Sequence, residues 1–396
     1  MWPAFEHQGR TRVVFGAGAL ARLGELAAAL GGTRVLLVSD AGVGRAGHSQ
    51  RAEAALTGAG LHVQRFDEVA ENPNTADVEV CARAMADARP DLLVAVGGGS
   101  AIDTAKAAAL IRASGRPLSE HAGHGRVERP VVPLVVVPTT AGTGSECQSA
   151  ALIGDPESHR KVACLDPQMA PRLALLDPEL TLSLPGVVTA SSGLDTLTHA
   201  LEAAVTRART PSSDLYAREA FRLAVEALGR VLEHPSDLAA RGRMLWASAL
   251  AGMAIEESML GAAHAAGNPL TRTRGLTHGF AVGVMLPEVM RFNAAEAPAR
   301  DVYAALSRLA GLAAPDADAD AAISALIERV DQLVERSGTR AAWRVAGVGE
   351  TDIPALADEA ASQWTAGYNP RAVSAADFAA LYAAARSRHR DPRSPL

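Results

Sequence analysis

The chain has 396 residues, of which 48% are hydrophobic and 21% are charged, and this composition excludes a disordered protein. A chain of this length exceeds the size that a single hydrophobic core usually supports, so two domains are expected. The net charge of −6 gives no support for a nucleic acid or an anionic membrane surface as a partner. Apolar runs such as 131–137 are too short to cross a bilayer, so no membrane-spanning segment is expected.

The cysteines and the N-terminus both favour a cytoplasmic protein. Cys81, Cys147 and Cys164 are odd in number and form no C-x-x-C pair, so a disulfide framework is not expected and a reducing compartment fits. The first residues lack the basic segment and following apolar segment that are typical of a secretory signal.

The first half alternates strand-like apolar runs with Ala- and Leu-rich helical segments. Strands are expected at 12–16, 34–39, 62–66, 91–96, 133–137 and 173–177, and helices at 19–29, 50–57 and 75–88. Such alternation is typical of a parallel, doubly wound sheet. An α/β domain is therefore predicted over residues 1–185.

Two glycine-containing loops follow consecutive strands of this predicted sheet. Gly97-Gly98-Gly99-Ser100 opens a helix, where the backbone can approach a phosphate closely and free N–H groups can bind it; a tight turn is the alternative. The loop 138–146 is rich in hydroxyl groups and glycine, which suits hydrogen bonds to a pyrophosphate, a ribose or a nicotinamide amide. Together the loops predict a dinucleotide crevice at the carboxyl ends of the strands.

Asp40 stands at the end of its predicted strand, where a carboxylate can accept hydrogen bonds from the ribose hydroxyls of adenosine. It would repel a 2′-phosphate, which favours NAD over NADP. The alternative is that Asp40 caps the turn that follows it.

The residue composition changes after Pro185. Ala, Leu, Glu and Arg at helical spacing dominate the rest of the sequence. An all-helical domain is therefore predicted over residues 186–396, with Ser374 capping the final helix. Helix breaks are expected at Pro211, Pro235, Asn268-Pro269, Pro287, Pro298, Pro315 and Asn369-Pro370.

A helix is predicted over 189–204, with Thr189, Ser191 and Ser192 as candidate caps. Asp195 and His199 stand four residues apart in it, so both side chains leave the same face. With His264 and His278 they would make a set of three nitrogens and one oxygen for a divalent first-row metal. On its own, the Asp195/His199 pair could equally be a surface polar pair or a capped turn.

These motifs together resemble the iron-containing (group III) alcohol dehydrogenase family. The matching segments are Gly97–Ser100 with Asp103 and Lys106, 138–146, 175–185, 193–202, His264, His278-Gly279 and Asn369-Pro370-Arg371. Because segments from both halves match in register, the resemblance covers nearly the whole chain.

The resemblance implies an α/β N-terminal dinucleotide-binding domain, an all-α C-terminal metal-binding domain, and catalysis in the cleft between them. The implied metal ligands are Asp195, His199, His264 and His278, and the metal is Fe2+ or, in some members, Zn2+. The implied cofactor is NAD(H), contacted by Asp40, Asn72, Gly98, Gly99, Ser100, Thr139, Thr140, Thr143 and Lys161. Asp103 and Lys106 are assigned to the support of the nucleotide loop, and a homodimer or larger homo-oligomer is a family expectation.

The sequence departs from the family pattern at Asn268, where members usually have a second histidine that is often assigned to proton transfer. An amide cannot shuttle a proton at neutral pH, so a relay at this position is in doubt. Asn268 could still position substrate or cofactor by hydrogen bonds, or Asn268-Pro269 could simply form a turn.

A second departure precedes His278, where Arg272 and Arg274 replace the apolar or aromatic residues of many relatives. Two arginines so close to the expected ligands could clamp a carboxylate, phosphonate or sulfonate of the substrate. The alternative is that both arginines lie on a solvated surface.

The sequence thus predicts a metal-dependent NAD(H) alcohol dehydrogenase or aldehyde reductase that acts on a small primary alcohol or aldehyde, with an anionic substrate as one option. In this chemistry the metal acts as a Lewis acid on the substrate oxygen while hydride passes to or from the nicotinamide. The alternatives are a maleylacetate-reductase-like enzyme without a need for metal, a dehydroquinate-synthase-like lyase, and a non-catalytic nucleotide-binding assembly protein.

Overall fold

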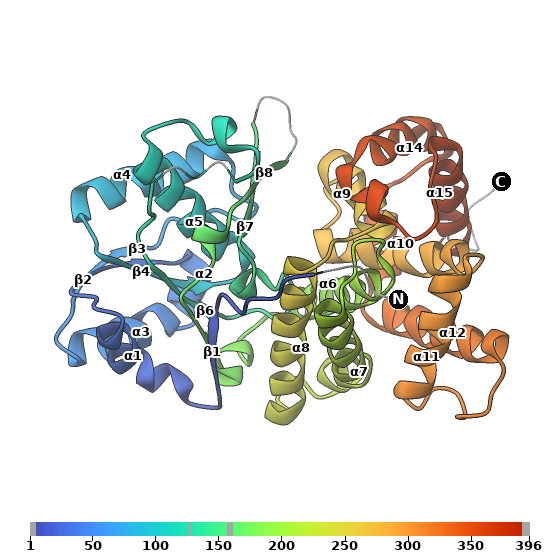
Figure 1. Cartoon of the computed structure of the whole chain (residues 1–396), viewed down its shortest axis with the longest axis horizontal. Helices are drawn as coiled ribbons and strands as arrows, with labels where there is room; N and C mark the ends of the chain where they lie inside the picture. The colour runs from blue at the N-terminus through green and yellow to red at the C-terminus, as the bar shows by residue number, and fades with distance from the viewer. Residues whose placement is uncertain (1–4, 126, 128, 157–160, 390–396) are drawn as a thin grey trace. The chain divides into compact units, whose positions relative to one another are not determined.

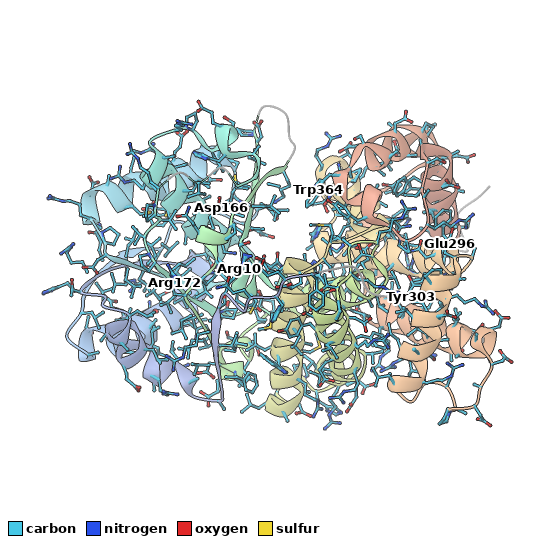
Figure 2. The ribbon with its side chains drawn as sticks, in the orientation of Figure 1. Arg10, Asp166, Arg172, Glu296, Tyr303 and Trp364 are labelled. Carbon is cyan, nitrogen blue, oxygen red and sulfur yellow. The ribbon has the colours of Figure 1, made fainter. Side chains whose placement is uncertain are left out.

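A computed structural model describes residues 5–125, 127, 129–156 and 161–389. It divides into two compact units, an α/β unit of Gln8–Leu184 and a helical unit of Pro185–Leu396 together with Met1–His7. Each unit buries its own core, with Leu36 fully buried in the first and Tyr303 in the second. Tyr303 is one of the side chains labelled in Figure 2. The predicted division into domains of residues 1–185 and 186–396 stays a prediction.

The α/β unit is built on a six-stranded sheet with strand order β1-β9-β6-β4-β2-β3, in which every pairing is parallel (Figure 1). The strands are β1 (Arg12–Phe15), β2 (Arg34–Val38), β3 (His62–Phe66), β4 (Leu92–Gly97), β6 (Leu134–Pro138) and β9 (Leu173–Leu176). All six predicted strands are present, with ends that differ by one residue at most. The predicted α/β fold class is confirmed.

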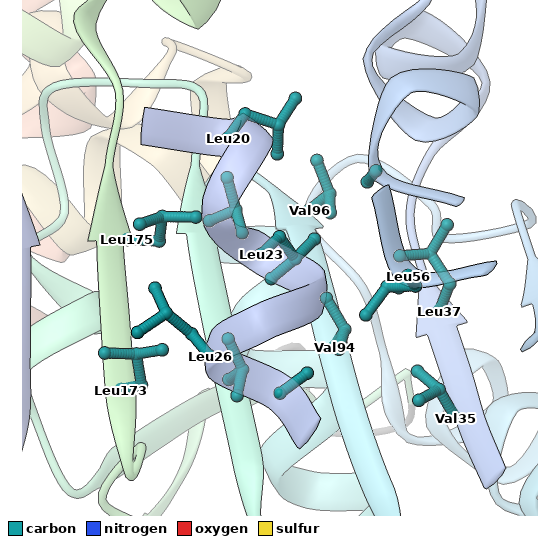
Figure 3. Close-up of a cluster of buried hydrophobic side chains, with 14 of the residues drawn as sticks. Leu20, Leu23, Leu26, Val35, Leu37, Leu56, Val94, Val96, Leu173 and Leu175 are labelled. Carbon is teal, nitrogen blue, oxygen red and sulfur yellow. The ribbon is translucent and has the colours of Figure 1, made fainter. Parts of the chain in front are cut away.

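Helices cover both faces of this sheet, with α1 and α3 on one side and α4 and α5 on the other (Figure 1). The bounds are η1 (Ala19–Arg22), α1 (Leu23–Ala29), α2 (Ala41–Arg45), α3 (His48–Gly58), α4 (Thr75–Ala88) and α5 (Gly99–Ser114). Alternate side chains of the strands, such as Val35 and Leu37 of β2, pack under α1 and α3 in one apolar cluster (Figure 3). Their neighbours Leu36 and Val38 are also buried, which explains why the central strands are continuous apolar runs.

The strand order creates a switch point between β2 and β4. From β2 the chain moves outward to β3 and then returns to the other side of β2 as β4. In open α/β sheets, ligands bind beyond the carboxyl ends of the strands at such a point. The end of β2 carries Asp40, and the end of β4 carries the glycine loop.

A second, three-stranded sheet of order β5-β8-β7 was not predicted from the sequence. Its strands are β5 (Gly123–His124), β7 (Ala150–Gly154) and β8 (Lys161–Leu165), with β7 and β8 antiparallel. Short strands of mixed polarity carry a weak periodic signal, which is why the sequence did not reveal them. Four further 3-10 helices belong to this unit: η2 (Leu118–His121), η3 (Ser145–Cys147), η4 (Pro167–Met169) and η5 (Pro178–Thr181).

The helical unit is assembled around α6 (Gly186–Val205), which packs against α7 (Pro211–Glu233), α8 (Leu238–Glu256) and α10 (His278–Asn293). The remaining helices are α9 (Ala262–Arg274), α11 (Ala297–Leu309), α12 (Ala319–Arg336), α13 (Thr339–Ala346), η6 (Glu350–Asp352), α14 (Ile353–Ser362), η7 (Trp364–Tyr368) and α15 (Ala375–His389). The all-helical prediction is confirmed for the described residues, and Ser374 caps α15 through its reciprocal bonds with Asp377. No helix among the described residues is long and apolar enough to cross a membrane.

The predicted cap of α6 is wrong. The helix begins at Gly186, before Thr189, Ser191 and Ser192, and Pro185 precedes it without a side-chain cap. Ser192 Oγ instead donates to the Val188 carbonyl (2.7 Å), and Thr189 Oγ1 accepts from Arg241 Nη1 (3.1 Å). Hydroxyl side chains inside a helix can bond back to its carbonyls, so their presence alone does not locate its start.

Two of the predicted helix breaks are also wrong, because Pro269 and Pro287 lie inside α9 and α10. Both prolines sit in buried helices, where packing on several neighbours outweighs the lost backbone hydrogen bond. The other prolines of the series occupy the first turn of a helix or lie between elements, as predicted.

The close contact between α1 and α3 gives a stability test. A Cβ on Gly24 would lie 2.1 Å from the Ala55 carbonyl oxygen, whereas a Cβ on Gly58 of α3 would meet nothing within 4 Å. We expect Gly24→Ala to lower the free energy of unfolding by about 1–3 kcal/mol through overpacking. Gly58→Ala should leave it unchanged or raise it by about 0.5–1 kcal/mol, because alanine favours the helix. Urea unfolding of both variants measures the difference, and equal effects would contradict the described helix contact.

Candidate metal centre and nucleotide-binding loops

One carboxylate oxygen lies close to all three histidines of the predicted metal site. His199 Nε2 lies 3.4 Å from Asp195 Oδ1, His264 Nε2 lies 3.5 Å from it, and His278 Nε2 lies 3.7 Å from it. Asp195 and His199 come from α6, His264 from the first turn of α9, and His278 is the first residue of α10. The structure therefore brings the four predicted ligands together from three helices.

The arrangement fits a metal ion and not a hydrogen-bonded cluster. Distances of 3.4–3.7 Å exceed the ~2.7–3.2 Å of N–H···O hydrogen bonds. Two ligand atoms on a tetrahedron with metal bonds of about 2.1 Å lie about 3.4 Å apart, which matches. Asp195 Oδ1 and His264 Nε2 are buried without a hydrogen-bond partner, although such orphaned atoms are costly. Asp195, His199 and His264 are also the group of described residues whose ligand atoms all lie within 4.8 Å of one another.

Charge interactions inside the cluster are strong. Burial alone would raise the pKa of Asp195, but the imidazoles of His199, His264 and His278 outweigh it and hold that pKa well below its usual range. Burial likewise lowers the pKa of His264, but the carboxylates of Glu202 and Asp195 raise it to about 9. The site therefore attracts positive charge, which a divalent cation supplies in place of protons.

The Glu202 carboxylate is hydrogen-bonded to the His264 ring. Its Oε2 accepts a hydrogen bond from His264 Nδ1 (2.5 Å), which leaves Nε2 of that ring as the atom that faces Asp195. A carboxylate behind a ligating histidine fixes its tautomer and raises its basicity. This role was not predicted from the sequence, although Glu202 stands seven residues after Asp195 and so on the same helix face.

The two predicted nucleotide loops lie side by side beyond β4 and β6. A Cβ on Gly99 would lie 2.7 Å from Thr143 Cγ2, and a Cβ on Gly98 would lie 3.1 Å from Thr140 Oγ1. The Thr139 N–H donates to the Gly97 carbonyl (3.0 Å), which joins the bases of the loops. Glycines at 98 and 99 are therefore required for this close approach.

Asp40 has the capping role that the sequence analysis kept as its alternative. Its Oδ1 accepts from the N–H groups of Gly42 (2.7 Å) and Val43 (2.9 Å) at the start of α2. A Cβ on Gly97 would lie 3.4 Å from Asp40 Oδ2, so the carboxylate also borders the glycine loop. Its contact with a ribose stays a prediction.

The remaining predicted cofactor residues lie around the start of α5. The Asn72 N–H points to Ser100 Oγ at 3.4 Å, and Asn72 itself adopts a positive φ of 52°. Lys161 begins β8 with an exposed side chain, yet desolvation lowers its pKa while the Asp103 carboxylate acts in the opposite direction. Their contacts with the cofactor stay predictions.

Lys106 and Asp103 of α5 bind the end of the loop 138–146 and the residues that follow it. Lys106 Nζ is buried and donates to the carbonyls of Ser145 (2.7 Å), Gln148 (2.8 Å) and Ala150 (2.9 Å). Asp103 accepts from Ser145 Oγ and from the Leu152 N–H (3.0 Å). These contacts tie the segment 145–152 to α5, in keeping with the supporting role assigned to both residues.

The side chains of Asn268, Arg272 and Arg274 contact α14 or the residues that cap it. Asn268 lies inside α9, one turn after His264, so its interpretation as a turn is wrong; its Nδ2 donates to Gln363 Oε1 (3.2 Å). Arg272 Nε donates to Glu359 (2.8 Å), and Arg274 forms an ion pair with Asp352. Both arginines are partly exposed and already hold carboxylates of α14 or of its N-cap, so the anion clamp stays a prediction.

Two family models match consecutive parts of the chain. The model described as iron-containing alcohol dehydrogenase matches residues 10–178, and the model of the C-terminal part of the Fe-containing alcohol dehydrogenase family matches residues 189–386. Together they span almost the whole chain.

Individual relatives are similar over nearly their full length. The chain is 33% identical to the NAD-dependent methanol dehydrogenase of Bacillus methanolicus, with 93% of this chain and 96% of that protein covered. It is 30% identical to the sulfoacetaldehyde reductase of Bilophila wadsworthia, with 96% and 98% covered. A crystal structure of 1,3-propanediol oxidoreductase superposes with a TM-score of 0.92 at 32% identity, covering 97% of this chain and 100% of that one.

The carboxylate behind His264 gives a metal-binding test. We expect Glu202→Gln to lower the affinity for Zn2+ or Fe2+ by about 10–100-fold, because the neutral glutamine has one acceptor oxygen and cannot accept from both His264 Nδ1 and the Ala263 N–H. Asp195→Asn removes the central ligand charge and should abolish stoichiometric binding. Glu226→Gln on the surface of α7 is the matched control, and its metal content by elemental analysis should equal that of the parent. An unchanged metal affinity in Glu202→Gln would contradict the assigned role.

Proposed function

The chain belongs to the iron-containing alcohol dehydrogenase family, and from that premise we propose that it is a metal-dependent NAD(H) alcohol dehydrogenase or aldehyde reductase. Its substrates are small primary alcohols or aldehydes. The observation that carries this proposal is the placement of three imidazole nitrogens within 3.7 Å of one buried, unpartnered carboxylate oxygen.

The residues of the metal centre have separate proposed roles. Asp195, His199, His264 and His278 would hold the metal, which when bound supplies a Lewis acid for the oxygen at the reacting carbon while the nicotinamide exchanges hydride. Glu202 keeps the His264 ring in the tautomer that binds a cation. The burial of Asp195, His199 and His264 keeps bulk water away and strengthens the electrostatic effect of the site.

The glycine and threonine loops and Asp40 are the proposed nucleotide site. They lie at the switch point of the sheet, and the N-terminus of α5 offers backbone N–H groups to a pyrophosphate. The Asp40 carboxylate would repel a 2′-phosphate, which supports NAD(H) over its phosphorylated form.

Asn268 has no proposed part in proton transfer. Its amide already donates to Gln363, and an amide does not titrate near neutral pH. The proton of the product alcohol is therefore proposed to come from water, a cofactor hydroxyl or another residue, and Asn268 to act only through hydrogen bonds.

The metal-dependent reading is favoured over its alternatives. A maleylacetate-reductase-like enzyme needs no metal and would not require the orphaned ligand atoms of Asp195 and His264. A dehydroquinate-synthase-like lyase recycles its cofactor, and an assembly protein would have no turnover. Each alternative therefore differs in a measurable property.

The substrate proposal includes aldehydes with an anionic group, because one relative is a sulfoacetaldehyde reductase. We also propose that the chain works in the cytoplasm as a homodimer or larger homo-oligomer, with small molecules as its other partners. Cys81, Cys147 and Cys164 form no disulfide in the described part of the chain, which supports a reducing compartment. Light scattering tests the oligomeric state.

Chelation tests the proposed chemistry. Metal-reconstituted protein should oxidise NADH with propanal, butanal, lactaldehyde, sulfoacetaldehyde, phosphonoacetaldehyde or succinic semialdehyde. A chelator should abolish the rate, and added Fe2+ or Zn2+ should restore it. Asp195→Asn should be inactive under all conditions. Full activity after chelation would favour the maleylacetate-reductase type, and turnover without net loss of NADH would favour a lyase.

The arginine variants test the anion clamp. Because Arg272 and Arg274 already pair with Glu359 and Asp352, we expect their replacement by alanine to lower the melting temperature. The ratio of kcat/KM between sulfoacetaldehyde and propanal should stay unchanged. A selective fall of tenfold or more for sulfoacetaldehyde, about 1.4 kcal/mol of transition-state binding, would instead establish the clamp.

A further inference from the structure

Helix α9 is capped by side chains from two other segments. Gly261 precedes the helix and has no side chain with which to cap it. The Ala262 N–H donates to Asn369 Oδ1 (3.2 Å), and the Ala263 N–H donates to Glu202 Oε1 (2.6 Å). The first N–H groups of a helix have no partner within it, so these two acceptors supply what the local sequence lacks.

Gly261 makes this capping sterically feasible. A Cβ at this position would lie 3.0 Å from Asn369 Oδ1 and 3.1 Å from Glu202 Oε1. These separations are tighter than ordinary carbon–oxygen contacts. Only a residue without a side chain lets both acceptors approach the end of the helix together.

Both the oxygen and the nitrogen of the Asn369 side-chain amide are fully hydrogen-bonded. Besides the Ala262 N–H, its Oδ1 accepts from Asn293 Nδ2 (3.1 Å), and its Nδ2 donates to Asn293 Oδ1 (2.7 Å) and to the Arg371 carbonyl (2.7 Å). The side chain is buried, with 1% of its surface exposed. An amide with two donors and two acceptor sites can make no more bonds than these, so its orientation is fixed.

Two partners of Asn369 belong to α9 and α10, which are two of the three helices that carry histidine ligands. His264 is the third residue of α9, directly after the capped Ala262 and Ala263, and Asn293 is the last residue of α10, which begins with His278. The next residues of the motif extend the same contact, because Arg371 Nη1 donates to the Phe292 carbonyl (2.9 Å) and its guanidinium lies 3.9 Å from the Phe292 ring centroid.

We propose that Asn369 is a positioning residue for the metal centre. It fixes the start of α9, and with it the ring of His264, relative to the helix that carries His278. It touches neither metal nor substrate, and it acts through the backbone of Ala262. The inference concerns metal binding and stands apart from the choice of substrate.

The test compares Zn2+ affinity in the full-length parent and three variants, by competition with a chromophoric chelator well below the unfolding temperature. Asn369→Ala should raise the Kd by about tenfold or more, as loss of other outer-shell contacts does. Asn293→Ala keeps the bond to Ala262 and should raise it less. Tyr382→Phe is the matched control, because Tyr382 Oη donates to the Ala266 carbonyl (2.6 Å) on the same helix beyond His264. Its Kd should equal that of the parent.

The visible spectrum of the Co2+-substituted proteins gives a readout that a merely structural role would not move. We expect the ligand-field bands to shift in Asn369→Ala and to stay in place in Tyr382→Phe. Equal increases in Kd for these two variants would overturn the proposal, as would a lower melting temperature of Asn369→Ala with unchanged Kd and spectrum.

If Asn369→Ala does not fold, Asn293→Ala and Gly261→Ala decide the question. A raised Kd in both supports the positioning role, and an unchanged Kd in either contradicts it. Raised Kd values in a protein that turns over no aldehyde would support this inference while counting against the proposed function.

Discussion

The helical unit depends on the burial of one carboxylate oxygen among three imidazoles. Asp195 Oδ1 is buried and has no hydrogen-bond partner, and a buried polar atom without one is costly to a fold. The three Nε2 atoms around it are too distant to be hydrogen-bonded to it but are spaced as ligands of one cation are. A divalent ion is the group that satisfies all four atoms at once.

Small residues make this convergence of helices possible. A Cβ on Gly279 would lie 1.9 Å from the Ser191 carbonyl oxygen, and one on Gly283 would lie 2.8 Å from Leu194 Cδ1, so α10 runs in close contact with α6. Gly267 of α9 meets α10 in the same way at Val282, where a Cβ would lie 3.0 Å from the backbone nitrogen. The glycines therefore bring the three ligand-bearing helices together, and the capping contacts of α9 then fix where the His264 ring lies.

Features that depend on local residue spacing could be predicted from the sequence. Short apolar runs predicted the six parallel strands, of which central ones such as β4 and β6 are buried on both faces, and the D-x-x-x-H spacing predicted the pair on α6. The resemblance to a known family added His264 and His278, which no local pattern could connect to α6. The roles of Glu202 and Asn369 were missed because they arise from tertiary contacts: Asn369 lies 107 residues from Ala262 along the chain. Pro269 and Pro287 misled the analysis for the same reason, since the packing that keeps their helices intact is not visible locally.

The most direct test of this account is the X-ray absorption spectrum of the iron-loaded protein, compared with that of Asp195→Asn. The account predicts one iron ion per chain, with a first shell of nitrogen and oxygen at about 2.0–2.2 Å and outer-shell scattering from several imidazoles. The Asp195→Asn protein should lose this signal. Stoichiometric iron with fewer imidazoles, or an unchanged spectrum in Asp195→Asn, would place the metal elsewhere and contradict the site.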